Sequence, residues 1–500
     1  MINNRLILTI AVAVLVAWNA MADNNQAPEA CLPVPSPQQV EWQKLETYAF
    51  IHFGPNTFND KEWGYGDAPA SSFNPTRLDC EQWVQTLVKA GMRGVILTCK
   101  HHDGFCLWPS RFTDYSVASS PFRNGKGDVV RELSEACKKY GIRFGVYLSP
   151  WDRHQASYGT QEYVTYYYNQ LEELMTQYGD VFEVWFDGAN GGDGWYGGAR
   201  EKREIDRSTY YNYPRAWGIV NRLQPSAIIF SDGGPGCRWV GNEKGYANAT
   251  NWAFLRGGQV YPGYPQYEEL QSGHADGDTW CASECDTSIR PGWFYHESED
   301  DKVKTVDELT DLYYRSVGHN GTLLLNFPVD RDGLIHPIDS ATAVQWHERI
   351  QRELGQNLLS KAKFSASDTR CKAYRADMAG DGNWDTYWAP SDGVTAADLI
   401  IKSKKEITLD CIMLQEYIPL GQRVKEFVIE SKTCCGKWVP VIGNEETTTI
   451  GYKRIVRFNE RTAKEWRIRI LDSRACPCIN NVEGFYVGVP LQAGEDSGGP

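Results

Sequence analysis

Residues 143–187 read RFGVYLSPWDRHQASYGTQEYVTYYYNQLEELMTQYGDVFEVWFD, and the spacing of their apolar residues indicates the fold class. An apolar run at Arg143–Ser149 is followed by apolar residues at helical spacing over Glu162–Tyr178 and by a second apolar run at Phe182–Phe186. Both apolar runs show little alternation with polar residues, which is typical of strands buried on both faces of a parallel sheet. The stretch therefore predicts a strand–helix–strand unit.

The same alternation of strands and helices extends from about Val40 to Leu354. The other expected strands are Tyr48–Phe53, Gly94–Cys99, Ala227–Ser231, Thr279–Ser283 and Thr322–Phe327, and the other expected helices are Cys80–Ala90, Asp128–Gly141 and Thr305–Ser316. Strands and helices that alternate this often favour a closed barrel over an open sheet. We therefore expect an α/β fold in which residues 38–355 form a (β/α)8-like barrel.

The pattern changes after Gly355. Residues 356–490 lose the helical spacing and show short strand-like runs between turn residues, such as Ile407–Leu414 and Lys453–Phe458. This arrangement is typical of an all-β sandwich. The Gly-rich residues 491–500 are expected to form a flexible tail.

Residues 1–22 have the features of a signal peptide. Arg5 closes a short basic start, Leu6–Val16 is almost continuously apolar, and Ala20-Met21-Ala22 supplies small residues for cleavage. The apolar run is shorter than the roughly 20 residues that a membrane span needs, and no later segment is long and apolar enough. We expect a bacterial-type signal that exports the protein to the periplasm or out of the cell.

Composition narrows the classes of partner. The formal net charge of −13 disfavours nucleic acid, whose phosphates would be repelled. The 18 Trp and 27 Tyr residues suit stacking on the apolar faces of sugars, although ordinary packing explains them equally well. The 14 Cys residues allow disulfides in an exported chain, with a pairing that the sequence leaves open, and they lack the spacing of a zinc site.

Two acidic residues are expected at the mouth of the barrel, where the C-terminal ends of parallel strands form active sites. Asp187 follows the strand Phe182–Phe186, and Glu284 follows the strand Thr279–Ser283. Carboxylates on separate strands suit glycoside hydrolysis, in which one attacks the sugar or activates water and the other protonates the leaving oxygen. The signal is weak by itself, because the chain has 64 Asp and Glu residues and Asp187 also fits the capping of a turn.

Adjacent histidines, His101 and His102, follow the strand Gly94–Cys99. Neighbouring side chains on a strand point to opposite faces, so this pair suits hydrogen bonds to a polyol better than joint ligation of a metal. A metal-dependent barrel hydrolase that uses both histidines nevertheless stays an alternative. His52, a single histidine after a strand, fits a structural role equally well.

Several segments resemble glycoside hydrolase family 29, the α-L-fucosidases, and they occur in one order over roughly His52 to Gly333. They are Phe50-Ile51-His52-Phe53-Gly54, Phe73-Asn74-Pro75-Thr76, Lys100-His101-His102-Asp103-Gly104-Phe105, Trp185-Phe186-Asp187-Gly188, and Leu324-Leu325-Asn326 with Asp330-Arg331-Asp332-Gly333. The resemblance implies a barrel enzyme that releases terminal L-fucose from fucosylated oligosaccharides or glycoconjugates by a retaining double displacement. No cofactor is required.

The resemblance also implies roles for individual residues. Asp187 would be the nucleophile and Glu284 the general acid and base of the subfamily that prefers α-1,3 and α-1,4 linkages, with Glu243 as the second choice for the acid. The two carboxyl groups of a retaining enzyme should lie about 5–5.5 Å apart. The residues expected to bind the substrate are His52, Glu62, Trp63, His101, His102, Tyr147, Trp185, Asp232, Trp239 and Trp293. A protein that binds carbohydrate without turnover is the alternative.

Residues 356–490 resemble a discoidin-like, family 32-type carbohydrate-binding module. The resemblance rests on Asp381-Gly382-Asn383-Trp384-Asp385-Thr386-Tyr387-Trp388 and Asn481-Val482-Glu483. Such modules often hold a structural Ca²⁺, and the expected ligands here are Asp381, Thr386 and Glu483. A domain that only braces the barrel is an equally good interpretation.

Overall fold

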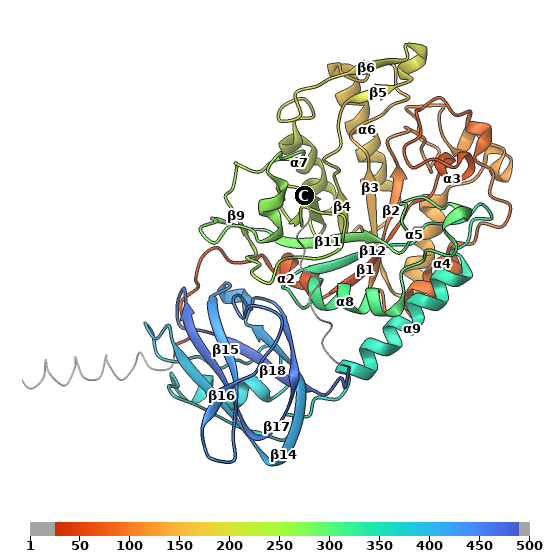
Figure 1. Cartoon of the computed structure of the whole chain (residues 1–500). Helices are drawn as coiled ribbons and strands as arrows, with labels where there is room; N and C mark the ends of the chain where they lie inside the picture. Colours follow the sequence, from red (N-terminus) through yellow and green to blue (C-terminus); the bar gives the residue numbers. More distant parts are fainter. Residues whose placement is uncertain (1–25, 490–500) are drawn as a thin grey trace, which may run out of the picture. The chain divides into compact units, whose positions relative to one another are not determined.

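The computed structural model of the protein describes residues 26–489. These residues divide into two compact units, one formed by Pro35–Gly355 and the other by residues 26–34 together with residues 356–489. Figure 1 follows the chain through both units. The predicted signal peptide (1–22) and the predicted tail (491–500) lie outside the described residues.

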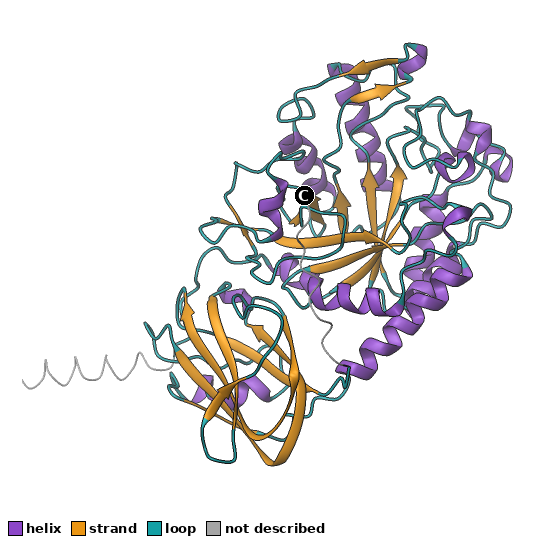
Figure 2. Cartoon of the chain, viewed as in Figure 1, coloured by secondary structure: helices purple, strands orange, loops and turns teal. Residues whose placement is uncertain are grey.

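The first unit is a closed barrel of parallel strands, which confirms the expected fold. In order around the barrel its strands are β1 (Thr47–Ile51), β12 (Thr322–Asn326), β11 (Ala282–Ser288), β8 (Cys237–Trp239), β7 (Ile228–Ser231), β4 (Glu183–Trp185), β3 (Arg143–Leu148) and β2 (Gly94–Lys100). Figure 2 shows them as a fan of orange arrows with purple helices outside. Most of these strands are buried along their whole length, as a barrel interior and a helical shell require.

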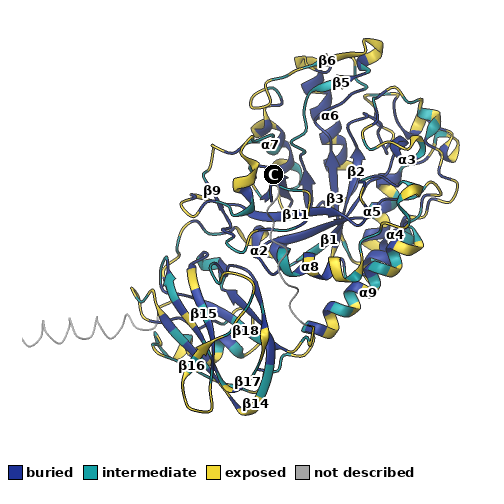
Figure 3. Ribbon diagram, viewed as in Figure 1, coloured by how far each residue is buried: buried dark blue, intermediate teal, exposed yellow. Residues whose placement is uncertain are grey.

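The helices of this unit are α2 (Pro37–Gln43), α3 (Pro55–Asn59), α4 (Cys80–Lys89), α5 (Val129–Tyr140), α6 (Gln161–Gln177), α7 (Tyr213–Leu223), α8 (Val306–Ser316) and α9 (Pro337–Leu354). Their ends follow the capping rules. The side chain of Asp128 accepts a hydrogen bond from the backbone N–H of Arg131, and Thr305 forms a capping box with Glu308. The longer helices bury one face and expose the other, which Figure 3 shows as blue and yellow sides.

Two strands of the barrel differ from expectation. The strand expected at Thr279–Ser283 is β11, which begins at Ala282 and runs to Ser288, whereas Thr279 and Trp280 form a short strand, β10, that pairs with β9 (Phe254–Leu255). β8 was not predicted, because it is only three residues long and lies in a Gly-rich segment. The shift of β11 places Glu284 within the strand, where the sequence had placed it after the strand's end.

The second unit contains an antiparallel sheet of β13 (Lys363–Ala366), β14 (Ala397–Glu416), β15 (Val424–Lys432), β16 (Trp438–Pro440), β17 (Arg454–Ser473) and β18 (Ile479–Phe485). β14 and β17 are both 20 residues long and contain register shifts, so runs predicted as separate strands belong to one strand in each case. Trp388, Phe427 and Trp466 are fully buried in its core. An all-β domain was expected here.

Candidate active site

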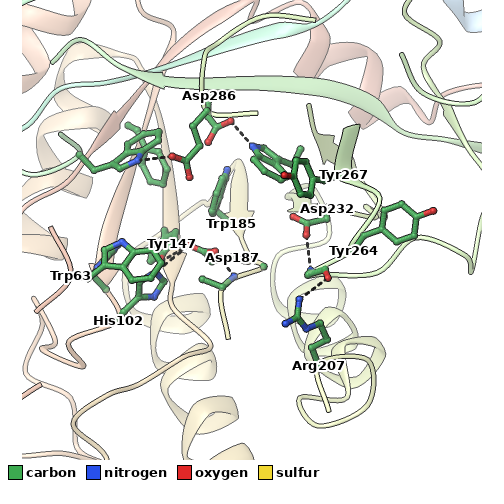
Figure 4. A pocket seen from close by; sticks show the side chains of 18 of the residues that line it. Trp63, His102, Tyr147, Trp185, Asp187, Arg207, Asp232, Tyr264, Tyr267 and Asp286 are labelled. Atoms are coloured by element: carbon green, nitrogen blue, oxygen red, sulfur yellow. Dashed lines mark hydrogen bonds and ion pairs between the residues drawn. The ribbon is translucent and has the colours of Figure 1, made fainter. Parts of the chain in front are cut away.

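A cavity of about 350 Å³ opens at the C-terminal ends of the barrel strands (Figure 4). It is lined by Phe50, His52, Trp63, His101, His102, Tyr147, Trp185, Asp187, Gly188, Ala189, Arg207, Asp232, Trp239, Glu243, Gly263, Tyr264, Pro265, Tyr267, Asp286 and Trp293. These residues include every predicted site residue of the barrel except Glu62 and Glu284. Several follow a strand directly, which is the position that the barrel fold provides for active-site residues.

Asp187 lies two residues after the end of β4 and reaches into this cavity. Its Oδ2 accepts a hydrogen bond from the hydroxyl of Tyr147 at 2.9 Å, and its Oδ1 accepts one from the backbone N–H of Ala189 at 2.7 Å. His102 Nε2 lies 3.7 Å from Oδ2. The carboxylate is thus held from two sides, yet its side chain stays 22% exposed and can reach a ligand.

Three histidines lie side by side on one wall. His52 Nδ1 hydrogen bonds with Asn326 Oδ1 at 2.8 Å, and His102 Nδ1 hydrogen bonds with Ser149 Oγ at 2.7 Å. Burial lowers the pKa of His52 to about 3 and that of His102 to about 4. Both rings are therefore neutral above about pH 5 and can exchange hydrogen bonds with sugar hydroxyls. His101 also lines the cavity, and in the described structure its buried Nδ1 has no hydrogen-bond partner.

Glu284 does not reach the cavity, which contradicts its assignment as the general acid and base. Its side chain is fully buried in the barrel, where it accepts hydrogen bonds from the hydroxyl of Tyr48 and from Trp185 Nε1, the latter at 2.7 Å. The reason is the register of β11, in which Glu284 pairs with Trp239 and Thr322 inside the strand. A buried group with both oxygens occupied has no path to a leaving group.

Two other carboxylates lie at the cavity. Glu243, which follows β8, is an exposed residue at the rim, and its Oε2 lies 3.3 Å from the donor Trp293 Nε1. Desolvation by the surrounding protein raises the pKa of Glu243, and the nearby charges of Asp187 and Glu62 raise it further. Asp286 belongs to β11, is only 3% exposed, and accepts a hydrogen bond from Trp239 Nε1 at 2.8 Å. Burial raises its pKa well above the usual range.

Glu62, the other predicted residue that is absent from the lining, holds the loop that carries Trp293. Its Oε2 accepts a hydrogen bond from the backbone N–H of Trp293 at 2.8 Å, and its Oε1 accepts one from that of Phe294 at 3.0 Å. His296 Nε2 also lies 2.8 Å from Oε1. The structure thus shows a contact of Glu62 with the wall of the cavity, and the contact of Glu62 with the substrate stays a prediction.

The outer rim contains residues that the sequence did not indicate. Tyr264 and Arg207 come from loops, and Tyr267 begins a short 3-10 helix (Tyr267–Gln271); none of them lies in a periodic pattern or a recognisable motif. Tyr267 packs near Trp239, with ring centroids 6.0 Å apart, and Arg207 Nη1 donates to the carbonyl of Gly263 at 3.1 Å. Figure 4 shows the two tyrosines and Arg207 on one side of Asp187 and His102 on the other.

Asp232 follows β7 and lines the same cavity. Its Oδ2 accepts a hydrogen bond from the backbone N–H of Gly263 at 2.6 Å, and burial raises its pKa to about 7. Asp232 therefore fixes a rim loop as well as facing a ligand.

The predicted metal ligands are only partly brought together. Asp381 Oδ2 accepts a hydrogen bond from the hydroxyl of Thr386 at 2.7 Å, whereas the neighbours that act on Glu483 are Asn481 and Lys453. Among the described residues, the one set of three His, Cys, Asp or Glu side chains close enough to share a metal ion is Glu183, Cys237 and Glu284, inside the barrel. His101 and His102 do not belong to such a set. None of the described helices has the length and apolar character needed to cross a membrane.

Comparisons with known proteins match both units of the chain. The alpha-L-fucosidase family profile matches residues 32–346, and the F5/8 type C domain profile matches residues 363–481. Alpha-L-fucosidase 1 of Arabidopsis thaliana is 42% identical over 470 residues, which span 92% of this chain and 89% of the relative. A crystal structure of a glycoside hydrolase 29 family member from an unknown rumen bacterium is 43% identical with a TM-score of 0.82, covering 94% of this chain and 80% of that one. The GH29 fucosidase of Ruminococcus gnavus in complex with fucose is 33% identical with a TM-score of 0.81, covering 92% and 96%.

Proposed function

This chain belongs to the alpha-L-fucosidase family, glycoside hydrolase family 29, and we propose that it releases terminal L-fucose from fucosylated glycans by a retaining double displacement. The observation that carries the proposal is the carboxylate of Asp187, which lies accessible in the cavity while Tyr147 and Ala189 fix its orientation. A nucleophile needs both properties, because it must reach the anomeric carbon in one defined direction.

The first step forms a covalent bond between the sugar and the enzyme. Asp187 attacks the anomeric carbon, the glycosidic C–O bond breaks, and a protonated Glu243 donates its proton to the leaving oxygen. An ester of fucose with Asp187 results. The positive charge that develops on the sugar lies next to the carboxylate of Asp187, which stabilises it.

The second step reverses the roles. Glu243, now a carboxylate, takes a proton from water, the water oxygen attacks the anomeric carbon from the side that the leaving group vacated, and the ester C–O bond breaks. Free fucose leaves, Asp187 is again a carboxylate and Glu243 is again protonated. These steps use only groups of the protein, and we propose that the reaction needs no cofactor or metal.

Glu243 suits the acid role better than Asp286 does. The acid must meet the leaving oxygen and exchange protons with water, and Glu243 is exposed at the rim, where the rest of the glycan would lie. Its raised pKa favours the protonated form that the first step needs. Asp286 is nearly buried and already holds Trp239 in place.

The cavity also suits a fucose unit at a chain end. Neutral histidines and aspartates offer partners to the hydroxyls, and Trp63, Trp185 and Trp293 offer apolar faces to the ring and its methyl group. A volume of about 350 Å³ is near the lower end of ligand pockets, which fits one sugar better than a long chain. We propose exo action, with the aromatic rim receiving the next sugars.

We propose that the linkage is α-1,3 or α-1,4, because the sequence resembles the family 29 subfamily that prefers these linkages. The test is a panel of α-1,2-, α-1,3-, α-1,4- and α-1,6-fucosylated oligosaccharides. Free fucose is measured by chromatography, and NMR identifies which anomer of fucose the protein releases first. We expect α-fucose from the α-1,3 and α-1,4 substrates. Binding without any release of fucose would instead support a carbohydrate-binding protein without turnover, and a β-anomer would overturn retention.

The second unit and the N-terminus add two further proposals. Residues 363–481 match the F5/8 type C domain, and we propose that this domain binds glycans, with Ca²⁺ at Asp381 and Thr386. We also propose export to the periplasm or out of the cell, which rests on the signal-like residues 1–22.

A further inference from the structure

Two glutamates lie inside the barrel without a cation beside them. Glu183 of β4 and Glu284 of β11 are both 0% exposed. A carboxylate oxygen of each lies within 4.8 Å of the other and of Cys237 Sγ. In the described part of the chain, no Lys or Arg forms an ion pair with either glutamate. Two carboxyl groups this close in an apolar interior need an explanation, because a buried charge is normally paired.

Indole N–H groups and a tyrosine hydroxyl donate hydrogen bonds to the carboxylate oxygens of the two glutamates. Trp42 Nε1 donates to Glu183 Oε2 at 2.8 Å, and Trp185 Nε1 donates to Glu284 Oε1 at 2.7 Å. The hydroxyl of Tyr48 donates to Glu284 Oε2. Three of the four carboxylate oxygens therefore already accept a hydrogen bond, and these bonds compete with the coordination of a metal ion. The surroundings therefore favour a proton between the two carboxyl groups.

Electrostatics lead to the same arrangement. Two ionised carboxylates in contact repel each other strongly, so one of them keeps a proton. Burial and the charge of Glu284 together raise the pKa of Glu183 well above its usual range. The other titratable groups that face the pair are Tyr48 of β1 and Cys237 of β8, and burial raises the pKa of both, which keeps them neutral. Burial raises the pKa of Glu284 as well. In the described structure Glu284 accepts an N–H or O–H hydrogen bond at each oxygen, whereas Glu183 accepts one at Oε2, so we place the proton on Glu183 with Glu284 as its acceptor.

Glu284 connects this pair to the cavity through Trp185. The indole of Trp185 lines the cavity and stacks on Phe230, with centroids 3.9 Å apart and planes inclined by 9°. Its ring centroid lies 5.4 Å from that of Tyr147, which holds Asp187. The hydrogen bond from Nε1 to Glu284 fixes the rotation of the indole within this stack.

We propose that Glu183 and Glu284, joined by one shared proton, are positioning residues that fix Trp185 as the floor of the cavity. The inference rests on the proposed function, since the floor matters for turnover only if the cavity binds the sugar. It gives the two buried acids a role that is separate from proton transfer to the substrate. Neither carboxylate contacts the reacting atoms.

The first test measures Tm against pH for Glu183→Gln. The folded protein binds the Glu183 proton more tightly than the unfolded chain does, so the wild type loses stability as pH rises from about 4.3, the unfolded value, through the raised folded pKa. Glutamine keeps the shape without titrating. We therefore expect the Tm of Glu183→Gln, relative to the wild type, to rise steadily between pH 4.5 and pH 8.

Glu173→Gln is the matched control. Glu173 is also buried and also accepts an indole N–H, from Trp108 at 2.9 Å, but it is paired with Arg111 at 3.1 Å. Because glutamine breaks this ion pair, we expect the control to lower the Tm at every pH above 5. A Glu183→Gln variant that behaves like the control would overturn the shared proton, and so would one equivalent of tightly bound metal found in the purified wild type by elemental analysis.

The second test compares Glu284→Met with Glu284→Gln in hydrolysis of an aryl α-L-fucoside. Methionine removes the acceptor of Trp185 Nε1, and we expect a loss of kcat/KM of up to about 100-fold, the effect of a misplaced active-site group. Glutamine keeps an acceptor oxygen, and we expect it to recover most of the activity. Equal losses in the two variants, or a folded Glu284→Met with wild-type kcat/KM, would overturn the positioning role. A wild type without fucosidase activity would refute the proposed function and leave the Tm test of the pair intact.

Discussion

Tyr147, in β3, donates its hydroxyl to Oδ2 of Asp187 at 2.9 Å, and Asp187 lies two residues after the end of the neighbouring parallel strand β4. Tyr147 pairs in register with Trp185, two residues before Asp187, so the sheet itself sets the distance between the hydroxyl and the carboxylate. Burial raises the pKa of Tyr147 well above its usual range, which keeps the hydroxyl protonated as a donor. A donor at this position steadies the carboxylate in one orientation.

Tyr147→Phe is expected to lower kcat by about 100-fold, the usual cost of losing one preorganised donor in an active site. Its KM should change little, because the hydroxyl contacts the nucleophile. Steady-state kinetics with an aryl α-L-fucoside measure both. Tyr167→Phe is the control, since Tyr167 is also buried but donates to the carbonyl of Leu148 away from the cavity. Equal kcat values for both variants would argue against the role of Tyr147.

Asp187→Asn should abolish turnover, with a loss of kcat of at least about 1,000-fold, because the amide cannot form the ester. Asp187→Ala leaves room for a small external nucleophile, and added azide should then produce fucosyl azide of inverted configuration from a substrate with a good leaving group. Mass spectrometry and NMR detect the product. The exposed Asp180→Asn is the control and should keep wild-type rates. Substantial activity in Asp187→Asn would refute the assignment.

Substrates with different leaving groups can show whether Glu243 or Asp286 is the acid catalyst. We expect Glu243→Gln to lose at least about 100-fold in kcat/KM on an oligosaccharide, whose leaving oxygen needs a proton, and much less on a dinitrophenyl fucoside, whose leaving group needs none. Asp286→Asn should affect both substrates equally, because Asp286 holds Trp239. If the dependence on the leaving group belonged to Asp286→Asn instead, the roles of the two residues would have to be exchanged.

The pH profile gives a further prediction for Glu243. An acid catalyst is active while it is protonated, so kcat/KM should be full below the raised pKa of Glu243 and fall as pH rises through it. Glu243→Gln should lose this alkaline limb on the dinitrophenyl fucoside. His52 and His102, with pKa values of about 3 and 4, are already neutral there. His102→Gln should therefore lower kcat/KM at all pH values without shifting the pH of the alkaline limb. A shift of that limb in His102→Gln would contradict its assignment to Glu243.

The sequence predicted those site residues that directly follow a strand of apolar residues. β2, β3 and β4 consist mostly of buried apolar residues, so their ends could be recognised in the sequence, and Asp187, His101 and His102 lie where they were expected. β11 is different, since Ser283, Glu284, Asp286 and Thr287 are polar residues inside a buried strand. Hydrophobic patterns place the end of such a strand too early, and Glu284 was misplaced for this reason.

The rim of the cavity could not be predicted in the same way. Trp239 and Glu243 depend on β8, which is three residues long and leaves no periodic signal. Arg207 and Tyr264 depend on loops whose course is set by contacts such as that of Arg207 with the carbonyl of Gly263, 56 positions further along the chain. Hydrogen bonds over such separations are formed by the fold and have no local sequence pattern.

The calcium proposal can be tested in the second unit by chelation. Asp381 and Thr386 already lie together through a 2.7 Å hydrogen bond, and the exposed carboxylate of Asp381 suits a hard cation. An ion at 100 times its Kd stabilises the fold by about 2.7 kcal/mol, so we expect EDTA to lower the Tm of this unit and Ca²⁺ to restore it. Asp381→Asn should lose the response, whereas Glu483→Gln should keep it, because Glu483 interacts with Asn481 and Lys453. A wild-type Tm that ignores both EDTA and Ca²⁺ would leave Asp381 and Thr386 as a hydrogen-bonded turn.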